Sequence, residues 1–348
     1  MTFNIRNHRL GDAEPVFIVA ELSGNHLQDF DIAVKTIDAM KSAGADAVKL
    51  QTYTADTLTI DVDNKHFRIE YGTLWDGKTL YELYQEAYTP WDWQPRLKDH
   101  SEHLGLTCFS TPFDRTAVDF LEKMDVPAYK IASFEVSDIP LVEYAASKGK
   151  PMILSTGIAT LDDIREAVDA CRRAGNDRIA LLKCTSAYPA PFEEVNLRTL
   201  PDMAEKFGTV VGISDHTLGI SVPIASVALG AKIIEKHFIL DRKLGGPDAA
   251  FSLEPAEFAQ MVRAVREVET ALGIVTYELS EKVRQSRVFA RSLFAVKDIL
   301  AGEPFTEENV RSIRPGYGLA PKHLSRVLGR KAKSDIKRGT PLDWDLVQ

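Results

Sequence analysis

Residues 41–50 read KSAGADAVKL, and this stretch contains the joint that most of the chain repeats. An amphipathic helical segment ends at Gly44, and a short apolar strand begins at Ala47. Glycine suits a helix C-terminus because it adopts the left-handed backbone conformation without steric cost. Equivalent joints occur in EHLGLTCF (102–109), SKGKPMIL (147–154), RRAGNDRIALL (172–182), KFGTVVGI (206–213) and ALGAKII (228–234).

These joints predict eight strands, each followed by a helix. The predicted strands are 16–21, 47–53, 106–111, 128–133, 151–156, 179–185, 210–215 and 232–239. Strands that alternate with helices pair in parallel, and eight such units within about 250–270 residues form an α/β (β/α)8 TIM barrel. An open doubly wound sheet is the alternative, but it needs a glycine-rich nucleotide loop after an early strand, and the sequence has none.

The pattern changes after Gly273. Residues 280–292, SEKVRQSRVFARS, are predicted to be a polar linker, and short strands and turns follow in FAVKDILAGEPFT (294–306), IRPGYG (313–318) and DIKRGTPL (335–342). We therefore expect a barrel domain over 1–279, the linker over 280–292 and a small β-rich domain over 293–348. The connection from 54 to 90 contains most of an aromatic stretch, LWDGKTLYELYQEAYTPW (74–91), and we expect it to pack over the barrel mouth.

Composition excludes several classes of function. The 348 residues are 45% hydrophobic and 26% charged, which is typical of a globular protein. No apolar run is long enough to span a bilayer, and the N-terminal MTFNIRNHRLGD lacks the apolar segment of a signal peptide. The three cysteines, Cys108, Cys171 and Cys184, have no paired spacing, which favours a cytoplasmic location. A net charge of −8 without a basic stripe argues against a nucleic-acid partner.

Polar side chains stand at the C-terminal ends of all eight predicted strands, where the active sites of TIM barrels lie. A single serine there is most simply solvated, but a buried unpaired polar group costs about 1–3 kcal/mol, so the whole set indicates a ligand. The candidates at or just after the strand ends are Glu21, Lys49, Gln51, Thr111, Phe113, Lys130, Ser133, Glu135, Ser155, Ser186, Tyr188, Ser214, His216, Glu235 and His237.

Two kinds of chemistry follow from these residue types. His216 and His237 end neighbouring strands, about 4.8 Å apart, so both imidazoles can bind one metal ion. Glu235 shares the face of His237 and can orient that site, and Asp248 in LGGPD offers a further carboxylate. Lysine and hydroxyl groups suit a phosphate and a carboxylate that are held together. Cys184 is interpreted as a small core residue, because no base can be assigned to it.

The motifs resemble those of the sialic acid synthase family, and the resemblance covers essentially the whole chain. They are FIVAELSGNH (17–26), AVKLQTY (47–53), FSTPFD (109–114), PAYKIASFE (127–135), ILSTG (153–157), KCTSAYPAP (183–191), GISDHT (212–217), EKHF (235–238) and GGPD (245–248). SIRPGYG (312–318) and DIKRGTPL (335–342) are similar to the antifreeze-like (SAF) domain found at the C-terminus of that family.

The resemblance implies an enzyme that joins phosphoenolpyruvate to an acetamido sugar and releases phosphate. It implies that phosphoenolpyruvate is held by Lys49, Thr111, Lys130, Ser133, Ser155, Ser214 and, less directly, Ser186. His216 and His237 would bind Mn²⁺, Mg²⁺ or Co²⁺, and Glu135 would handle the attacking water. The sugar would face Glu21, Gln51, Tyr188 and Asp248, with Phe113 as a further substrate-binding residue. Arg314 would reach the active site of the other subunit in a domain-swapped homodimer.

Within the family, the chain looks most similar to pseudaminic acid synthases. It has ELSGNH where N-acetylneuraminate synthases usually read EIGxNH, it contains the LWDGKTLYELY insert, and it has Ser186 where many of them have asparagine. Leu74, Trp75, Tyr81 and Tyr84 of the insert are expected near the barrel mouth. An N-acetylneuraminate or legionaminic acid synthase is the alternative.

Two other functions are less favoured. A metal-dependent pyruvate aldolase would also use histidine ligands at a barrel end, but it has no use for so many phosphate-type donors. A carbohydrate- or ice-binding tail on an inert barrel would leave the ring of polar strand ends without a purpose.

Overall fold

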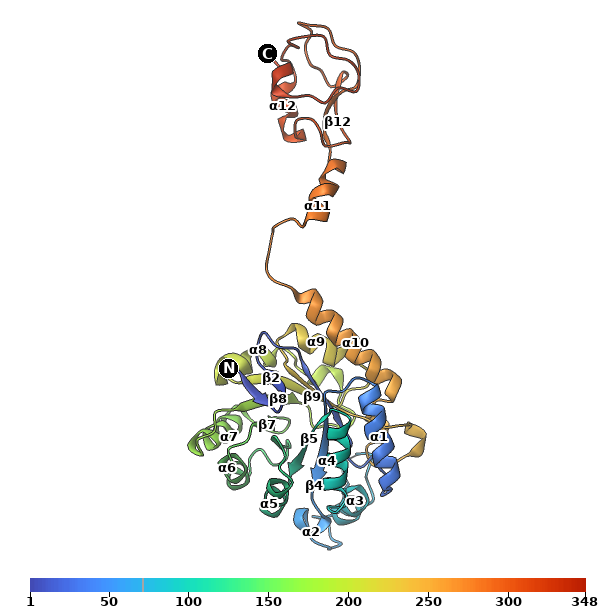
Figure 1. Ribbon diagram of the computed structural model, residues 1–348, viewed down its shortest axis with the longest axis vertical. Coiled ribbons are helices and arrows are strands. Elements are labelled where there is room, and N and C mark those ends of the chain that lie inside the picture. Colours follow the sequence, from blue (N-terminus) through green and yellow to red (C-terminus); the bar gives the residue numbers. More distant parts are fainter. Residues whose placement is uncertain (71) are drawn as a thin grey trace. The chain divides into compact units, whose positions relative to one another are not determined.

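The computed structural model describes residues 1–70 and 72–348, which form two compact units, Met1–Gly273 and Ile274–Gln348. In the first unit eight parallel strands close a barrel in sequence order, and the last strand pairs with the first (Figure 1). They are β3 (Phe17–Glu21), β4 (Ala47–Thr52), β5 (Thr107–Pro112), β6 (Tyr129–Ile131), β7 (Met152–Ser155), β8 (Ile179–Cys184), β9 (Val210–Asp215) and β10 (Ile233–His237). The predicted (β/α)8 barrel is confirmed.

Helices surround this barrel (Figure 1). The main ones are α1 (Phe30–Ser42), α4 (Gln94–His103), α5 (Arg115–Lys123), α6 (Ile139–Ser147), α7 (Leu161–Arg173), α8 (Thr199–Phe207), α9 (Ser221–Ala228) and α10 (Pro255–Leu272). Asp29 and Asp114 cap α1 and α5 by accepting hydrogen bonds from the first free backbone N–H groups. Gly44 has φ +89°, as expected for the joint between helix and strand.

The barrel interior is apolar at its N-terminal end, and a hairpin closes it there. The hairpin strands β1 (Phe3–Ile5) and β2 (His8–Leu10) pair antiparallel. Phe3, Ile5 and Leu10 are buried in one cluster with interior strand residues such as Phe17 and Phe109. The sequence analysis did not predict this hairpin, because two three-residue strands give too short a periodic signal. The hairpin thus covers the apolar part of the barrel interior at this end.

The connection between β4 and β5 contains two short helices, α2 (Ala55–Leu58) and α3 (Leu80–Ala87). Thr79 caps α3 in a capping box with Glu82. The connection is fastened to the loop after β3, where the buried His26 Nε2 lies 3.1 Å from Thr89 Oγ1. A Cβ on Gly24 would lie 3.3 Å from Ala87, so this loop and α3 are in close contact.

The second unit has its own apolar core, built from residues such as Leu293, Phe305, Val310 and Leu342. Its elements are α11 (Glu281–Ser286), β11 (Ser292–Ala295), β12 (Val310–Ile313) and α12 (Leu324–Val327), and β11 pairs antiparallel with β12. Short 3-10 turns complete the chain at Phe192–Glu194, Arg242–Leu244, Ala249–Phe251, Arg287–Phe289, Pro321–His323 and Trp344–Leu346.

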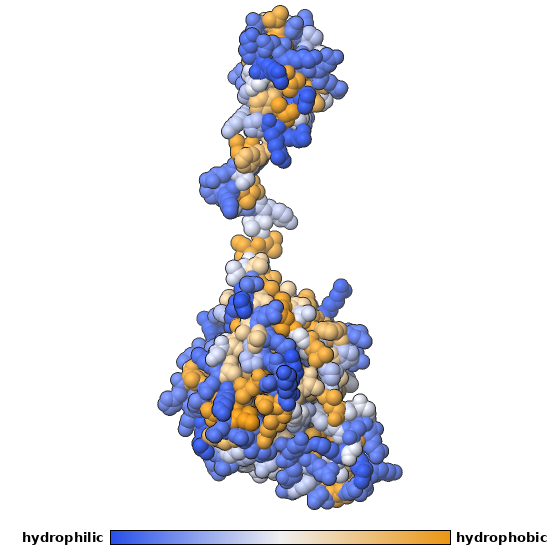
Figure 2. Space-filling view, turned by 90° about the vertical axis from the view of Figure 1, so that its right-hand side faces the viewer, coloured by the Kyte–Doolittle hydropathy of each residue, from blue (hydrophilic) through white to orange (hydrophobic). Residues whose placement is uncertain are grey.

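The segment between the units differs from the prediction of a linker over 280–292. The units divide after Gly273, and part of the predicted linker is the helix α11. The residues without regular structure come earlier, and Ile274, Val275 and Tyr277 are 83%, 96% and 97% exposed. Figure 2 shows hydrophobic side chains, in orange, along this segment. Among the residues that the structure describes, no helix is long and apolar enough to cross a membrane.

Candidate active site

A cavity of about 480 Å³ lies at the C-terminal ends of the strands. Its walls bring together residues that the sequence analysis selected at or just after all eight strand ends and in the loop after β10. They are Glu21, Lys49, Gln51, Phe113, Lys130, Ser133, Glu135, Ser155, Ser186, Tyr188, Ser214, His216, His237 and Asp248. Glu235, which was expected to orient the site, also lines it. Period-two alternation explains the result, because side chains two positions apart face the same side of a strand.

The floor of the cavity is a buried network of two lysines and two carboxylates. Lys49 Nζ lies 2.9 Å from Glu21 Oε2 and 2.8 Å from Glu235 Oε1. Lys130 Nζ donates to Ser155 Oγ at 2.7 Å and lies 3.6 Å from Glu235 Oε1. Burial alone would lower the pKa of Lys49, but the two carboxylates outweigh it and raise the pKa. Burial dominates for Lys130 and lowers its pKa.

Glu21 and Glu235 stay ionised for the same reason. Burial would raise the pKa of Glu21, but His237 and Lys49 outweigh it and hold the pKa well below its ordinary value. Lys130 and Lys49 likewise lower the pKa of Glu235 against burial. Two positive and two negative charges therefore lie together in a desolvated floor.

Hydroxyl and backbone groups form a cradle beside this floor. Gly157 N donates to Ser133 Oγ at 3.0 Å. A Cβ on Gly157 would lie 2.1 Å from Ser186 Oγ and 2.7 Å from Ser133 Oγ, so only glycine fits there. Ser186 Oγ is buried and has no hydrogen-bond partner among the described residues. A free donor at such a spot is suited to an oxyanion.

Glu135 differs from the other carboxylates of the cavity. Burial raises its pKa to about 7, although Lys130 opposes the shift. Its Oε2 atom is buried and finds no partner within residues 1–70 and 72–348. A carboxyl group with a pKa near neutrality is suited to accept or donate a proton during a reaction.

The two predicted metal ligands face one another across β9 and β10. The ring centroids of His216 and His237 are 5.3 Å apart. His216 Nδ1 lies 3.2 Å from Thr185 O, which leaves its Nε2 free. His237 Nε2 lies 3.2 Å from Glu21 Oε2, and its Nδ1 is buried without a partner in the described part of the chain.

These two imidazoles fit a divalent metal ion, because each has a free ring nitrogen and the orphaned Nδ1 needs a partner. No group of three or more His, Cys, Asp or Glu side chains is arranged to hold a metal among the residues described. An ion bound by the two histidines therefore needs further ligands from water or substrate.

Cys184 was interpreted as a core residue, and the structure corrects this. It is only 3% exposed, yet it lines the cavity, and its Sγ lies 3.7 Å from His216 Nδ1. Burial raises the pKa of the thiol, but the adjacent His216 outweighs it and lowers the pKa to about 7. Sequence alone could not pair Cys184 with a base, because the two residues lie on different strands.

The opposite wall of the cavity is apolar and comes from the connection between β4 and β5. It includes Leu58, Ile69, Trp75, Leu80, Leu83, Tyr84 and Ala87. The prediction that this connection covers the mouth is therefore confirmed. Of the four residues of this connection that were expected near the mouth, Trp75 and Tyr84 line the cavity. Leu74 is instead 51% exposed, and Tyr81 does not line the cavity but donates to Asp56 Oδ1 at 3.1 Å.

Two other predicted residues do not line the cavity. Thr111 is buried beside Gln51, its partner in the β4–β5 register, and its Oγ1 has no hydrogen-bond partner among the described residues. Arg314 is an exposed residue of the second unit. Ser23, a polar residue that follows the first predicted strand, also lines the cavity and donates to Asp248 Oδ2 at 2.5 Å. Its backbone has φ +47°, a local conformation that the strand pattern does not predict.

Not every polar strand end belongs to the cavity. Lys236 Nζ donates to Asp215 Oδ2 at 2.5 Å and to Thr217 O at 2.6 Å. Both side chains alternate with cavity residues along β9 and β10, so they point away from the barrel interior. Lys236 is fully buried, and the pair joins the two strands outside the site.

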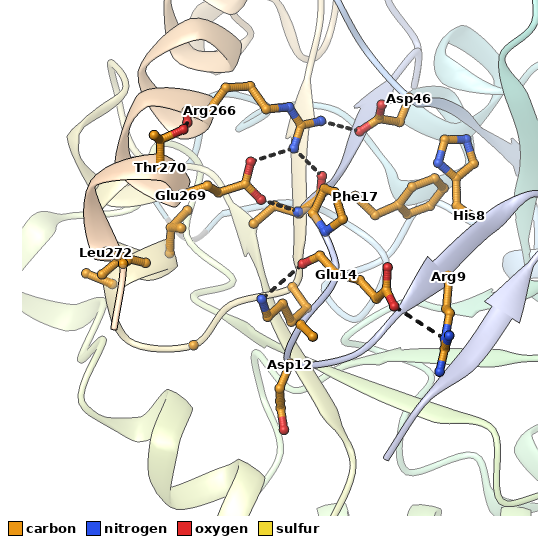
Figure 3. Close-up of a pocket in the computed structure, with 18 of the residues that line it drawn as sticks. His8, Arg9, Asp12, Glu14, Phe17, Asp46, Arg266, Glu269, Thr270 and Leu272 are labelled. Atoms are coloured by element: carbon orange, nitrogen blue, oxygen red, sulfur yellow. Dashed lines mark hydrogen bonds and ion pairs between the residues drawn. The ribbon is translucent and has the colours of Figure 1, made fainter. Parts of the chain in front are cut away.

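A larger hollow of about 1140 Å³ lies at the other end of the barrel, beside the hairpin and the end of α10 (Figure 3). Several of its charged groups are paired: Arg266 lies 2.9 Å from Asp46 Oδ2 and 2.9 Å from Glu269 Oε2, and Arg9 lies 3.4 Å from Glu14 Oε1. The smaller cavity at the opposite end is instead lined by Glu135, Ser186, Glu235 and His237, each of which has a buried polar atom without a partner among the described residues. This difference identifies the smaller cavity as the candidate active site.

Comparison with known proteins identifies the family of each part of the chain. The NeuB family model matches residues 36–277, and the SAF domain model matches residues 290–348. The chain is 49% identical to pseudaminic acid synthase of Campylobacter jejuni, over 94% of this chain and 95% of that one. It is 46% identical to pseudaminic acid synthase of Helicobacter pylori, over 96% and 98%. The crystal structure of N-acetylneuraminic acid synthetase from Leptospira borgpetersenii aligns with a TM-score of 0.74 at 32% identity, over 82% of this chain and 95% of that one.

The arrangement of the two histidines predicts metal binding that can be measured without any assay of activity. We expect calorimetry with Mn²⁺ or Co²⁺ to detect one ion per chain. His216→Ala or His237→Ala should weaken binding at least tenfold, since the loss of even an outer-shell partner costs about 10–100-fold. The exposed His103 provides the control His103→Ala, which should bind as the native chain does. Native affinity in a chain that lacks both cavity histidines would contradict the assignment.

Proposed function

This chain belongs to the NeuB family and is an enzyme of the sialic and pseudaminic acid synthase type, and we propose that it makes pseudaminic acid. Its substrates would be phosphoenolpyruvate and 2,4-diacetamido-2,4,6-trideoxy-L-altrose, and phosphate would leave by C–O cleavage. One observation supports this most: the cavity joins a charged floor with free oxyanion donors to an apolar wall.

The charged floor supports binding of phosphoenolpyruvate. Lys49 and Lys130 supply the positive charge that its carboxylate and phosphate require. Ser133, Ser155 and Ser186 add hydroxyl groups beside them. Because this region is desolvated, such fixed donors stabilise growing negative charge more strongly than water does.

The proposed reaction forms one carbon–carbon bond and breaks the bond between carbon 2 of phosphoenolpyruvate and its phosphate oxygen. The π electrons of phosphoenolpyruvate form a bond from its carbon 3 to the aldehyde carbon of the sugar, and carbon 2 becomes an oxocarbenium centre. Water adds to carbon 2, and the bond from carbon 2 to the phosphate oxygen then breaks as the ketone forms. One proton of that water neutralises the alkoxide made at the aldehyde oxygen, and the other leaves with the phosphate.

Glu135 is the residue that we assign to the water. Its carboxyl group lines the cavity and has an oxygen without a partner in the described part of the chain. With a pKa near 7, a large fraction is ionised at neutral pH and can accept the proton of the water as the water adds to carbon 2.

His216 and His237 would hold a Mn²⁺, Mg²⁺ or Co²⁺ ion, which when bound supplies Lewis-acid stabilisation of charge on the aldehyde oxygen. Glu21 Oε1 accepts a hydrogen bond from Gln51 Nε2, and Glu21 Oε2 lies beside both Lys49 Nζ and His237 Nε2. These contacts fix the orientation of the histidine ring.

The apolar wall supports the choice of sugar. A 6-deoxy sugar with two acetamido groups presents more methyl surface than N-acetylmannosamine. Burial of each methyl-sized group is worth about 0.8 kcal/mol, so two or three groups give roughly 30-fold discrimination. Ile69, Leu83 and Tyr84 are among the side chains that would cover them. The alternative is an N-acetylneuraminate or legionaminic acid synthase, which would use a different N-acetylated sugar.

We also propose that the enzyme is a domain-swapped homodimer in which the partner's tail completes the site. Exposed apolar side chains stand on five successive loops at the C-terminal face of the barrel: Phe134, Ile158, Phe192, Leu218 and Leu244 are 45–56% exposed. A cluster of this kind is typical of an interaction surface. Arg314 and Tyr317 are exposed on the second unit, and the positive charge of Arg314 suits an anionic substrate.

The substrate proposal predicts phosphate release from phosphoenolpyruvate when the diacetamido altrose is added. We expect kcat/KM for that sugar to exceed the value for N-acetylmannosamine by at least 30-fold, because the apolar wall buries its methyl groups. Both sugars are assayed with one preparation, and sugar-free phosphate release is the control. Equal kcat/KM for the two sugars would refute the choice of substrate but not the reaction class.

The raised pKa of Glu135 predicts a pH profile. The ionised form is needed to accept a proton, so kcat/KM should rise with pH through about 7 and level off above it. Glu135→Gln should lower kcat by about 10²–10⁴-fold and remove that limb. Glu143→Gln, at an exposed site on α6, is the control. If kcat/KM of Glu135→Gln still rises through about pH 7, the titrating group is a residue other than Glu135.

The homodimer proposal predicts complementation between two inactive chains. Arg314→Ala and Lys49→Ala should each be inactive, and their mixture should recover up to about a quarter of the native rate, because half of the dimers are mixed and one of their two sites is whole. Native mass spectrometry would confirm subunit exchange. A mixture that stays inactive although mixed dimers form would show that Arg314 does not act in trans.

A further inference from the structure

The turn at residues 72–77 is built to present a single side chain, that of Trp75. The carboxylate of Asp76 accepts hydrogen bonds from Gly72 N, Thr73 N and Thr73 Oγ1, each at 2.8 Å. Gly72 and Gly77 flank the turn with φ +73° and +95°, and a Cβ on either would meet no atom within 4 Å. The turn is therefore organised locally, and both ends adopt a left-handed backbone conformation that glycine accepts without steric cost.

Trp75 reaches across the cavity mouth to two other loops. Its Nε1 donates to Pro247 O at 2.9 Å, in the loop after β10. Its ring lies 5.6 Å from the ring of Tyr188, in the loop after β8. Tyr188 in turn packs against His216 at 4.5 Å and against Phe251 at 5.2 Å between ring centroids. One side chain thus connects the apolar wall with the loops that border the histidines.

The loop that accepts this hydrogen bond also carries a polar residue of the site. Asp248 follows Pro247 directly, lines the cavity and accepts hydrogen bonds from Ser23 Oγ and Gly24 N. Gly245 and Gly246 precede Pro247 with φ +75° and +110°, so the path of this loop depends on backbone conformations that favour glycine. The hydrogen bond from Trp75 Nε1 to Pro247 O restrains this loop at the cavity mouth.

We propose that Trp75 is a latch: it holds the 54–90 connection against the loops after β8 and β10 and so positions Tyr188 and Asp248 for the sugar. Trp75 is a positioning residue in this scheme, and its effect falls on the sugar rather than on phosphoenolpyruvate. The latch rests on the proposed function for the identity of the ligand. The contacts themselves do not depend on the reaction.

The test removes the indole N–H and keeps an aromatic ring. Trp75→Phe should raise KM for the sugar about five- to tenfold, the effect of one lost hydrogen bond, and leave KM for phosphoenolpyruvate within about twofold. The matched control is Tyr81→Phe, which removes a comparable bond in the same connection, from the Tyr81 hydroxyl to Asp56 Oδ1 at 3.1 Å, at a side chain that does not line the cavity. It should leave the sugar KM unchanged.

A second measurement needs no activity. Lys65 and Arg68 are exposed tryptic sites within the connection, and Trp75→Phe should speed cleavage there at least threefold in the free enzyme, while Tyr81→Phe should not. If the native enzyme does not use the sugar, the proposed function fails and this comparison still tests the latch. Native cleavage rates in Trp75→Phe, or equal rates in the two variants, would overturn the proposal. Faster cleavage with an unchanged sugar KM would overturn its positioning role.

Discussion

The buried contact of Lys49 with Glu21 and Glu235 is the constraint on which the site depends. Charges taken out of water are costly unless each has a close partner, and here the two lysines and two carboxylates of the floor balance one another. The apolar layer below, sealed by the N-terminal hairpin, keeps water from the interior. An anionic ligand must therefore compete with Glu21 and Glu235 for the lysines, which makes the free donor of Ser186 and the unpartnered Nδ1 of His237 important for binding.

Much of this arrangement could be predicted, because two simple periodicities decide it. The eight strands and the convergence of Lys49, Gln51 and Tyr53 on one cavity follow from alternation along parallel strands. The same rule also separates Asp215 and Lys236 from the site, although both are polar residues at strand ends. Applied strictly, alternation would have placed that pair outside the barrel.

The remaining features depend on contacts between distant segments or on local backbone conformation. The position of Ser23 follows from a left-handed backbone conformation, and that of Trp75 from a turn organised by one carboxylate. Cys184 meets His216 only because β8 and β9 are neighbours in the closed barrel. Leu74 and Tyr81 look equivalent to Trp75 and Tyr84 in sequence, and only the path of the connection separates the two pairs.

The two sides of the cavity have different origins in the chain. The charged floor is assembled from the ends of separate strands, so a change at one of them disturbs partners contributed by the others. The apolar wall comes mostly from one continuous stretch between β4 and β5. Evolution can therefore replace that stretch as one unit. Such a replacement would change which sugar the cavity accepts and leave the charged floor unaltered. The same separation makes the stretch a natural unit to exchange when related synthases are engineered.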